Sequence, residues 1–228
     1  MEPKLHEEYV YTPALPEGVD TLMPGMVKLP EGFEGRLMIP ESVLIIGDCC
    51  FYEEPISAVS LPKSLRRIGL SAFEGCRLKE IRVEGDGEKI IIGLGAFMDN
   101  PELTAITLGN CGLCDDIFNS SPVSRVKLTG ECIHYGKNPF GFGCHYNRNY
   151  EENFFETVRD KYGGALGTYI LKGKLVKTNY KQYVHKTGKQ MHYVDIEACK
   201  DCDKHCYTLE GFENDRCKAP VFEWEKVE

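Results

Sequence analysis

Phenylalanine recurs along this chain at a nearly constant interval, and each copy falls inside a similar short phrase. From Phe51 onward the spacings are 22, 24, 21 and 22 residues. The series consists of Phe33, Phe51, Phe73, Phe97, Phe118 and Phe140. A fixed period in the low twenties is typical of a solenoid, in which each unit buries its apolar face against the next one. The repeat therefore constrains the architecture far more than it constrains the function.

The residues around each phenylalanine repeat as well. An aliphatic residue stands five positions before it and a glycine four positions before it, with Cys114 once in the place of the glycine. These positions hold Ile46, Ile68, Ile92 and Leu113, followed by Gly47, Gly69, Gly93 and Gly136. A glycine there suits a turn with positive φ or a close approach of two backbones. The ranges 56–61, 78–83, 103–108 and 123–128 end in alternating apolar and polar residues, which predicts half-buried strands.

The best copy has the pattern L-x-x-I-G-x-x-A-F-x-x-C-x-x-L-x-x-I-x-V. Its residues are Leu65, Ile68, Gly69, Ala72, Phe73, Cys76, Leu78, Ile81 and Val83. This phrase resembles the BspA-type leucine-rich repeat of many bacterial and some protist proteins, over roughly residues 25–145. The resemblance implies a curved stack with one short strand per repeat, a role in holding other molecules, and no catalysis. We accordingly expect an α/β-type solenoid, a leucine-rich repeat right-handed superhelix of about four to five coils.

Three segments follow from this interpretation: an N-terminal segment at residues 1–24, the repeat domain at 25–145, and a small α+β region at 146–228. In the last region, a capping box at residues 149–152 predicts a helix that runs to about Lys161 and ends at Gly163-Gly164. Residues 168–178 and 183–196 alternate around glycine-containing turns, which predicts two hairpins. We expect this region to cap the open end of the solenoid.

The residues between the buried strand positions are predicted to face outward on the concave side. They form two ladders, Ala58, Glu80, Ala105 and Arg125, and Ser60, Arg82, Thr107 and Lys127. No aromatic residue occurs among them, so Arg82 and Arg125 are the anchors that a protein interface would use. We interpret the chain as a non-enzymatic binding protein whose partner is an unidentified protein or other macromolecule. The alternative is that the contacts lie in the C-terminal region.

Lysines gather in that region. From Lys161 to Val194 there are seven lysines and no carboxylate, although the whole chain has a net charge of −8. Five tyrosines are interleaved with them, as on surfaces that bind single-stranded nucleic acid. However, lysines also protect hairpin edges from aggregation, and the segment has no arginine to read bases. Docking on an acidic surface is therefore favoured over nucleic-acid binding.

The chain has 11 cysteines, and one group of them has the spacing of a metal site. The group is Cys199, Cys202, Cys206 and Cys217, a C-x2-C-x3-C-x10-C arrangement with His205 as a substitute ligand. Four thiolates at such spacing can enclose tetrahedral Zn²⁺, so the hypothesis is a structural zinc site. The alternative is free or pairwise-oxidised thiols. Cys111 and Cys114 form a C-x-x-C, but it lies inside a repeat, so packing accounts for it better than redox chemistry.

The sequence lacks the motifs of common enzyme classes. It has no phosphate-binding glycine loop before a helix, no H-E-x-x-H and no G-x-S-x-G, so we expect no catalytic activity. The apolar runs are too short to cross a bilayer. The N-terminus carries no secretory signal, which favours the cytoplasm, with the cell surface or secretion as the alternative if a leader was removed.

Overall fold

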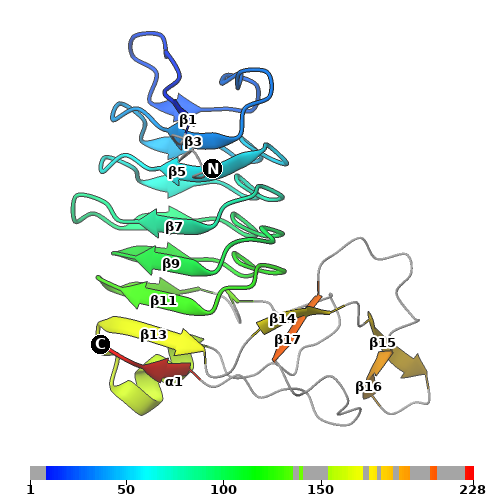
Figure 1. Cartoon of the computed structure of the whole chain (residues 1–228). Helices are drawn as coiled ribbons and strands as arrows, with labels where there is room; N and C mark the ends of the chain where they lie inside the picture. The colour runs from blue at the N-terminus through cyan, green and yellow to red at the C-terminus, as the bar shows by residue number, and fades with distance from the viewer. Residues whose placement is uncertain are drawn as a thin grey trace, which may run out of the picture.

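The chain is an elongated stack of coils in its computed structural model, and each coil contributes short strands to two faces (Figure 1). The structure describes residues 9–135, 139–140, 154–171, 175–178, 181–186, 190–195, 206–209 and 224–228. The "odd face" consists of β1 (Tyr9–Tyr11), β3 (Gly35–Met38), β5 (Ile56–Ser60), β7 (Glu80–Val83), β9 (Ala105–Leu108) and β11 (Arg125–Leu128). The "even face" consists of β2 (Thr21–Leu22), β4 (Ile45–Ile46), β6 (Arg67–Ile68), β8 (Ile90–Ile92), β10 (Cys111–Leu113) and β12 (Cys132–His134).

Strands pair in parallel along the whole even face and, on the odd face, from β1 to β5 and from β7 to β11, as expected when the chain passes each face once per coil. The even face is one six-stranded sheet, so the solenoid has about six turns, where the sequence predicted four to five. The sheets extend before residue 25, because β1 and β2 pair with β3 and β4. Those first turns lack the full repeat phrase, which is why the count from sequence was low.

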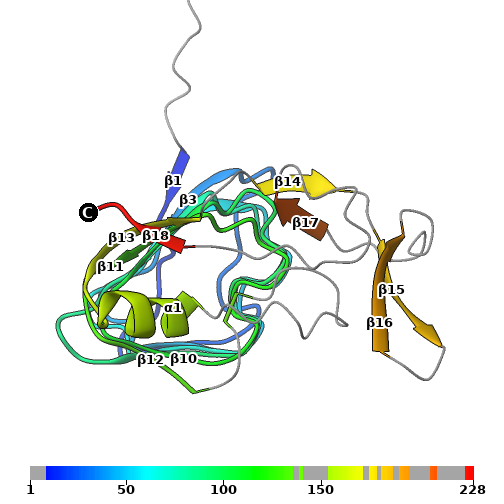
Figure 2. The same cartoon turned by 90° about the horizontal axis from the view of Figure 1, so that it is seen from below.

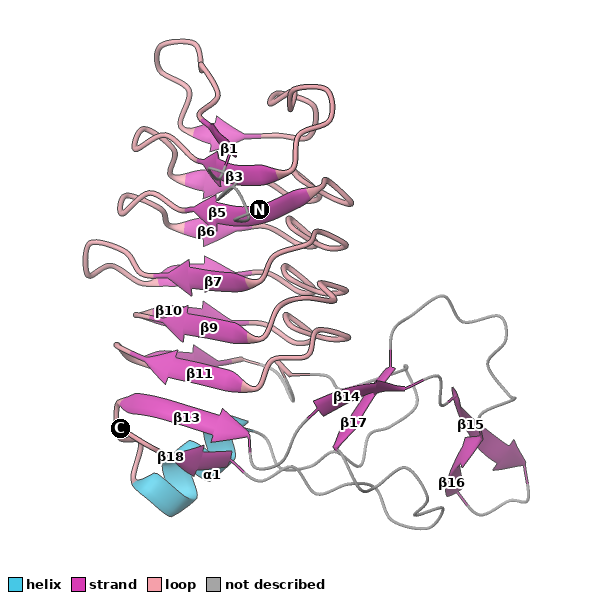
Figure 3. Ribbon diagram, viewed as in Figure 1, coloured by secondary structure: helices cyan, strands magenta, loops and turns pink. Residues whose placement is uncertain are grey.

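Two further expectations about the coils were wrong. Each coil contains two strands instead of one, because the short segments that end at Ile46, Ile68, Ile92 and Leu113 also form strands, on the even face. These strands are only two or three residues long, too short to show alternation in the sequence. The solenoid is also a β-solenoid and not an α/β type. Among the described residues, the single helix follows the last coil (Figure 3).

The phenylalanines form one column through the interior, as the repeat predicts. The rings of Phe51, Phe73, Phe97, Phe118 and Phe140 stack with centroids 5.2, 5.5, 5.7 and 5.2 Å apart. All five are at most 2% exposed. Phe33 packs differently, edge-on against Tyr9 and Tyr11 of β1. Burial of large rings in offset stacks is a major source of stability in such a narrow core.

The repeated glycines allow close backbone approach, which was one of the two roles predicted for them. A Cβ at Gly69 would lie 2.5 Å from the backbone of Gly47, and one at Gly93 would lie 2.7 Å from the backbone of Gly69. Real Cβ atoms do not approach backbone atoms so closely. At these positions any other residue would push successive coils apart.

A third repeated feature was not recognised from the sequence. The residue three positions after Phe73, Phe97 and Phe118 donates a hydrogen bond to the phenylalanine carbonyl of the preceding coil. Cys76 Sγ donates to Phe51 O at 3.2 Å, Asn100 Nδ2 to Phe73 O at 2.8 Å, and Ser121 Oγ to Phe97 O at 3.0 Å. These buried side chains satisfy carbonyls that the irregular turns leave without ladder partners.

A cap closes the C-terminal end of the solenoid, as predicted. Helix α1 (Phe154–Tyr162) ends at Gly163 and Gly164, both with positive φ. It lies against the end of the stack together with β13 (Gly167–Leu171) and β18 (Trp224–Lys226) (Figure 2). Phe154 and Trp224 contact Phe140, the last ring of the column. The aromatic core therefore continues from the coils into the cap.

The first of the two predicted hairpins is wrong and the second is confirmed. β13 does not pair with β14 (Leu175–Thr178); it pairs antiparallel with β11 and with β18. Tyr169 and Leu171 of β13 are buried, so covering the last coil outweighs the local turn. β14 pairs with β17 (Cys206–Leu209), whereas β15 (Lys181–Lys186) and β16 (Gln190–Asp195) form the expected hairpin.

Candidate binding depression on the odd face

The outward-facing residues of the odd face lie in the register that the sequence predicts. Across β7, β9 and β11, Glu80 pairs with Ala105 and Ala105 with Arg125. The second ladder joins Arg82, Thr107 and Lys127 in the same way. Their carboxylate, guanidinium and ammonium groups are on exposed residues, while the two small residues are half-buried between them. The small side chains of the middle strand β9 therefore form a shallow groove between the charged side chains of β7 and β11.

The other two predicted residues, Ala58 and Ser60, belong to a separate sheet. β5 ends the three-stranded sheet β1-β3-β5, and β7 begins the five-stranded sheet that continues to the cap. Arg77 N donates to Ile56 O at 3.0 Å and Lys79 N to Ser57 O at 3.3 Å, before the two strands separate. Figures 1 and 3 show a wider interval here than between β7 and β9. The odd face is therefore interrupted between β5 and β7.

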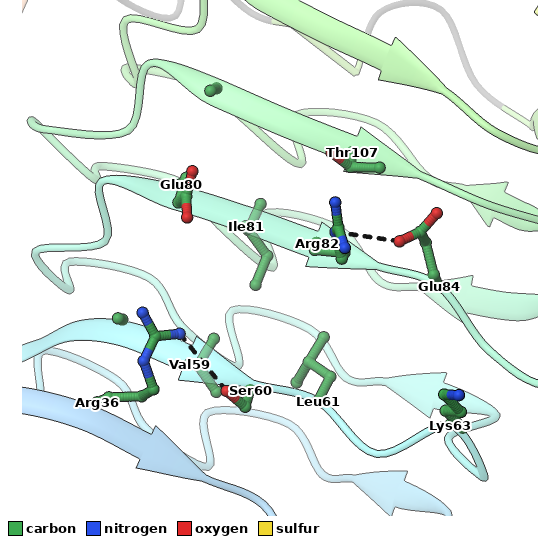
Figure 4. A pocket seen from close by; sticks show the side chains of 12 residues that line it. Arg36, Val59, Ser60, Leu61, Lys63, Glu80, Ile81, Arg82, Glu84 and Thr107 are labelled. Carbon is green, nitrogen blue, oxygen red and sulfur yellow. Dashed lines mark hydrogen bonds and ion pairs between the residues drawn. The ribbon is translucent and has the colours of Figure 1, made fainter. Parts of the chain in front are cut away.

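A depression of about 550 Å³ occupies this interruption (Figure 4). Six of the eight predicted face residues line it: Ala58, Ser60, Glu80, Arg82, Ala105 and Thr107. Arg125 and Lys127 face outward one strand beyond it and are not part of its lining. The structure thus places the predicted residues of β5, β7 and β9 around one depression, whereas the predicted residues of β11 lie outside it.

Six further lining residues were missed by sequence reasoning. They are Arg36, Val59, Leu61, Lys63, Glu84 and Ile81. Arg36 is the register partner of Ala58, so it continues the first ladder one coil earlier. It was missed because the spacing from Phe33 to Phe51 is 18 residues, which breaks the repeat at that coil. Val59 and Ile81 were taken only as core, whereas the interruption of the sheet brings them to the floor of the depression.

The depression combines charged walls with an apolar floor. Val59 and Ile81 are 7% and 2% exposed. Arg82 Nε forms an ion pair of 3.1 Å with Glu84 Oε2, and the Arg82 side chain remains 71% exposed. On the opposite wall, Arg36 Nη1 donates a hydrogen bond of 3.5 Å to Ser60 Oγ. An exposed ion pair such as that of Arg82 holds its side chain weakly, so this guanidinium group can turn toward a bound partner.

The predicted zinc ligands lie mostly outside the described residues. Cys199, Cys202 and Cys217 are in undescribed segments, and Cys206 is the first residue of β17. Within the part of the chain that the structure describes, no group of three or more His, Cys, Asp or Glu side chains is placed to hold a metal ion. Zinc at the four cysteines stays a prediction, which elemental analysis of protein purified without chelator will test.

The comparisons with known proteins identify the repeat. Residues 35–146 match the BspA type leucine rich repeat region, in six copies. No curated protein and no solved structure matches the chain. The part of the chain that the structure describes contains no helix with the length and hydrophobicity of a membrane span. Five of the six even-face strands, β4 to β12, lie within the matched residues, and residues 35–146 of this chain form a BspA-type leucine-rich repeat region.

Proposed function

We propose that this protein is a non-enzymatic binding protein whose protein partner docks in the depression between β5 and β7. The repeat family suggests a role in protein interaction. The observation that carries the assignment of the site is the interruption of the odd face, which creates a hollow with an apolar floor on an otherwise continuous sheet. Hollows of this kind exclude water from the contact and concentrate binding energy.

The chemistry of the lining favours a polypeptide as the ligand. Three cations and two carboxylates surround the apolar floor, so a bound chain finds partners for charges of both signs and for an apolar side chain. Arginine is the charged residue most enriched at interface hot spots, and Arg36 and Arg82 stand on opposite walls. The small residues Ala58 and Ala105 leave room for a side chain of the partner. The proposed ligand is therefore a protein segment that inserts one apolar side chain between the two arginines.

The first experiment finds the partner by site-specific photo-crosslinking. A photoreactive residue at Ser60 lies in the depression, whereas one at Arg67 lies on the even face, with a side chain that is 56% exposed. We expect a discrete cross-linked protein from position 60, in extract of the native host, that is not obtained from position 67. Equal cross-linking from both positions contradicts the assignment.

The second experiment measures affinity for the recombinant partner. Arg82→Glu reverses a charge on the wall of the depression, and Arg125→Glu makes the same change on the same face outside it. We expect Arg82→Glu to weaken binding about tenfold or more, and Arg125→Glu to have a small effect. Thr107→Trp fills the depression without altering charge and should also weaken binding. If Arg125→Glu weakens binding as much as Arg82→Glu, the partner covers the whole face and the depression is not the anchor.

A further inference from the structure

Two cysteines from successive coils lie opposite each other at the edge of the even face. Cys111 begins β10 and Cys132 begins β12, and the two are register partners in adjacent parallel strands. Both are free thiols. The sequence pairs Cys111 with Cys114 as a C-x-x-C, but the fold gives it a different neighbour 21 positions later.

The spacing of these strands suits a covalent link. Neighbouring strands lie about 4.8 Å apart, and disulfides join residues whose Cα atoms are about 4.4–6.8 Å apart. Register partners in parallel strands direct their side chains to the same side of the sheet. Cys111 lies on the inner side, beside Ile90, which is 1% exposed. Cys132 lies beside it on β12, the edge strand of the sheet.

Cys132 affects the electrostatics of the Cys111 thiol. Contact with the Cys132 thiol, together with burial, raises the pKa of Cys111 well above its ordinary range. Their remaining contacts are weak sulfur–carbonyl interactions, from Cys111 Sγ to Val83 O at 3.7 Å and from Cys132 Sγ to Gly109 O at 3.3 Å. Cys111 is fully buried and Cys132 is half-buried, so reagents reach the pair through Cys132.

We propose that Cys111 and Cys132 form a redox-sensitive dithiol that closes to a disulfide in the presence of a low-molecular-weight disulfide. The Cys132 thiolate attacks one sulfur of the reagent, which forms a mixed disulfide and releases one reagent thiolate. The Cys111 sulfur then attacks the Cys132 sulfur, and its proton passes to the second reagent thiolate, which leaves as a thiol. Two protein thiols are oxidised and one reagent disulfide is reduced to two thiols. The product links the fifth and sixth strands of the even face covalently.

Cys114 is the natural competitor for Cys111, and its place in the fold argues against it. Leu113 points inward and is fully buried, like Cys111. Because side chains alternate along a strand, Cys114 at the glycine position of the repeat points away from Cys111. There Cys114 N donates to Ile92 O at 3.1 Å. Cys114 is thus fixed to the turn of the preceding coil, while Cys132 stands directly beside Cys111.

Peptide mapping under non-reducing conditions tests the proposal. The folded full-length chain is incubated with oxidised glutathione at pH 8.5, alkylated and digested with trypsin. Cys111 and Cys114 fall in the peptide 90–125, and Cys132 is the sole cysteine of the peptide 128–137. We expect a cross-linked pair of these peptides, lighter than their sum by two hydrogen atoms. The pair should form in the folded protein and disappear on reduction.

Three variants identify the sulfur atoms. Cys114→Ser should retain the cross-linked pair, whereas Cys132→Ser and Cys111→Ala should abolish it. In the oxidised wild type, the thermal midpoint should be higher than in the reduced form, because the link closes a loop across two coils. The exposed Cys49 reports that the reagent is active by forming a mixed disulfide with glutathione. The proposal fails if Cys49 is modified while Cys132 stays a thiol or keeps glutathione, or if Cys114→Ser removes the cross-link.

Discussion

At the scale of single residues, the interior of this solenoid depends on hydrogen bonds as well as on rings. Asn100 is fully buried and satisfies two backbone groups in the preceding coil, accepting from Leu78 N at 3.1 Å and donating to Phe73 O at 2.8 Å. Its neighbours in the same column, Cys76 and Ser121, perform the second of these tasks with smaller side chains. The position therefore requires a donor and does not require a particular residue type.

Replacing Asn100 tests the value of these buried bonds. Asn100→Leu leaves the Leu78 N–H and the Phe73 carbonyl buried without a partner, so we expect the free energy of unfolding to fall by about 3 kcal/mol. Asn110 is a matched control, because its side chain makes two comparable bonds, to Gly87 O and from Glu131 N, that are exposed. Asn110→Leu should cost less than about 1 kcal/mol. Equal losses in urea titrations of the two variants would contradict this account.

The cysteines of the coils should differ sharply in reactivity. Burial raises the pKa of Cys50 and of Cys76 to about 12, whereas the adjacent Cys49 is exposed. Since the thiolate is the reactive form, iodoacetamide at pH 8 should modify Cys49 rapidly and leave the other two thiols intact. Fragment-ion mass spectrometry separates Cys49 from Cys50. Comparable labelling of both would show that the coil opens locally.

The same raised pKa values predict how stability changes with pH. The folded state favours the neutral thiol, so its contribution to stability is complete below the ordinary thiol pKa of 9.0. That contribution is lost as the pH rises from 9 toward 12, because only the unfolded chain ionises freely there. Urea titrations across this range should show a falling free energy of unfolding. A Cys50→Ala/Cys76→Ala variant should show a smaller fall.

At the scale of secondary-structure elements, the cap shows how a local pattern yields to a tertiary demand. Residues 168–178 read as a hairpin, but β13 leaves that turn to pair with β11 and to cover the open end of the stack. Gly167 permits the close passage of the C-terminal strand, since a Cβ there would meet the Glu228 carbonyl. An end that would otherwise expose Phe140 is thereby buried under α1, β13 and β18.

Trp224 is the residue that joins β18 to this cap. It is 1% exposed, and its ring lies 4.9 Å from Phe154 and 5.9 Å from Phe140. Trp224→Ala removes these contacts and should lower the stability of the cap by about 3–5 kcal/mol. Hydrogen exchange should then accelerate at the amides of β13 and α1. Val227→Ala, at a side chain that is 46% exposed, should leave exchange unchanged. Unchanged protection in both variants would mean that the cap does not depend on this ring.

At the scale of the whole molecule, the stability of each coil depends on its neighbours. Each coil contacts the next through the phenylalanine column, the carbonyl hydrogen bonds and the two sheets, so damage to one coil reaches its neighbours first. The interruption of the odd face between β5 and β7 does not divide the molecule. The even face and the ring stack from Phe51 to Phe73 continue across it.

Phe73 stands at this junction and tests the coupling. Phe73→Ala should lower the free energy of unfolding by about 3–5 kcal/mol as a core truncation. We expect hydrogen exchange to increase first in β4 to β8, on both sides of the variant coil. Tyr52→Ala, at a ring that is 44% exposed, is the control and should have little effect. A loss of hydrogen-exchange protection that is confined to the variant's own coil would show that the coils unfold independently.

The sequence by itself determined the repeat and its interior. The phenylalanine period, the glycine positions and the inward aliphatic residues are local, and each is imposed again in every coil, so one pattern specifies the stack. The outward ladders followed from the same alternation. The short even strands were not predicted because two or three residues are too few to show an alternating pattern. The first turns were not predicted because the spacing from Phe33 to Phe51 breaks the repeat.

Only the tertiary structure decided where the coils separate, which cysteines meet and how the stack is closed. The depression exists because β5 and β7 belong to different sheets. No residue type in either strand predicts that the sheet is interrupted there. Cys132 becomes the neighbour of Cys111, and β13 the neighbour of β11, through contacts between segments far apart in sequence. The physical reason is the same in each case: a repeat pattern fixes which side of each strand is buried, whereas pairing between coils depends on how the whole stack packs.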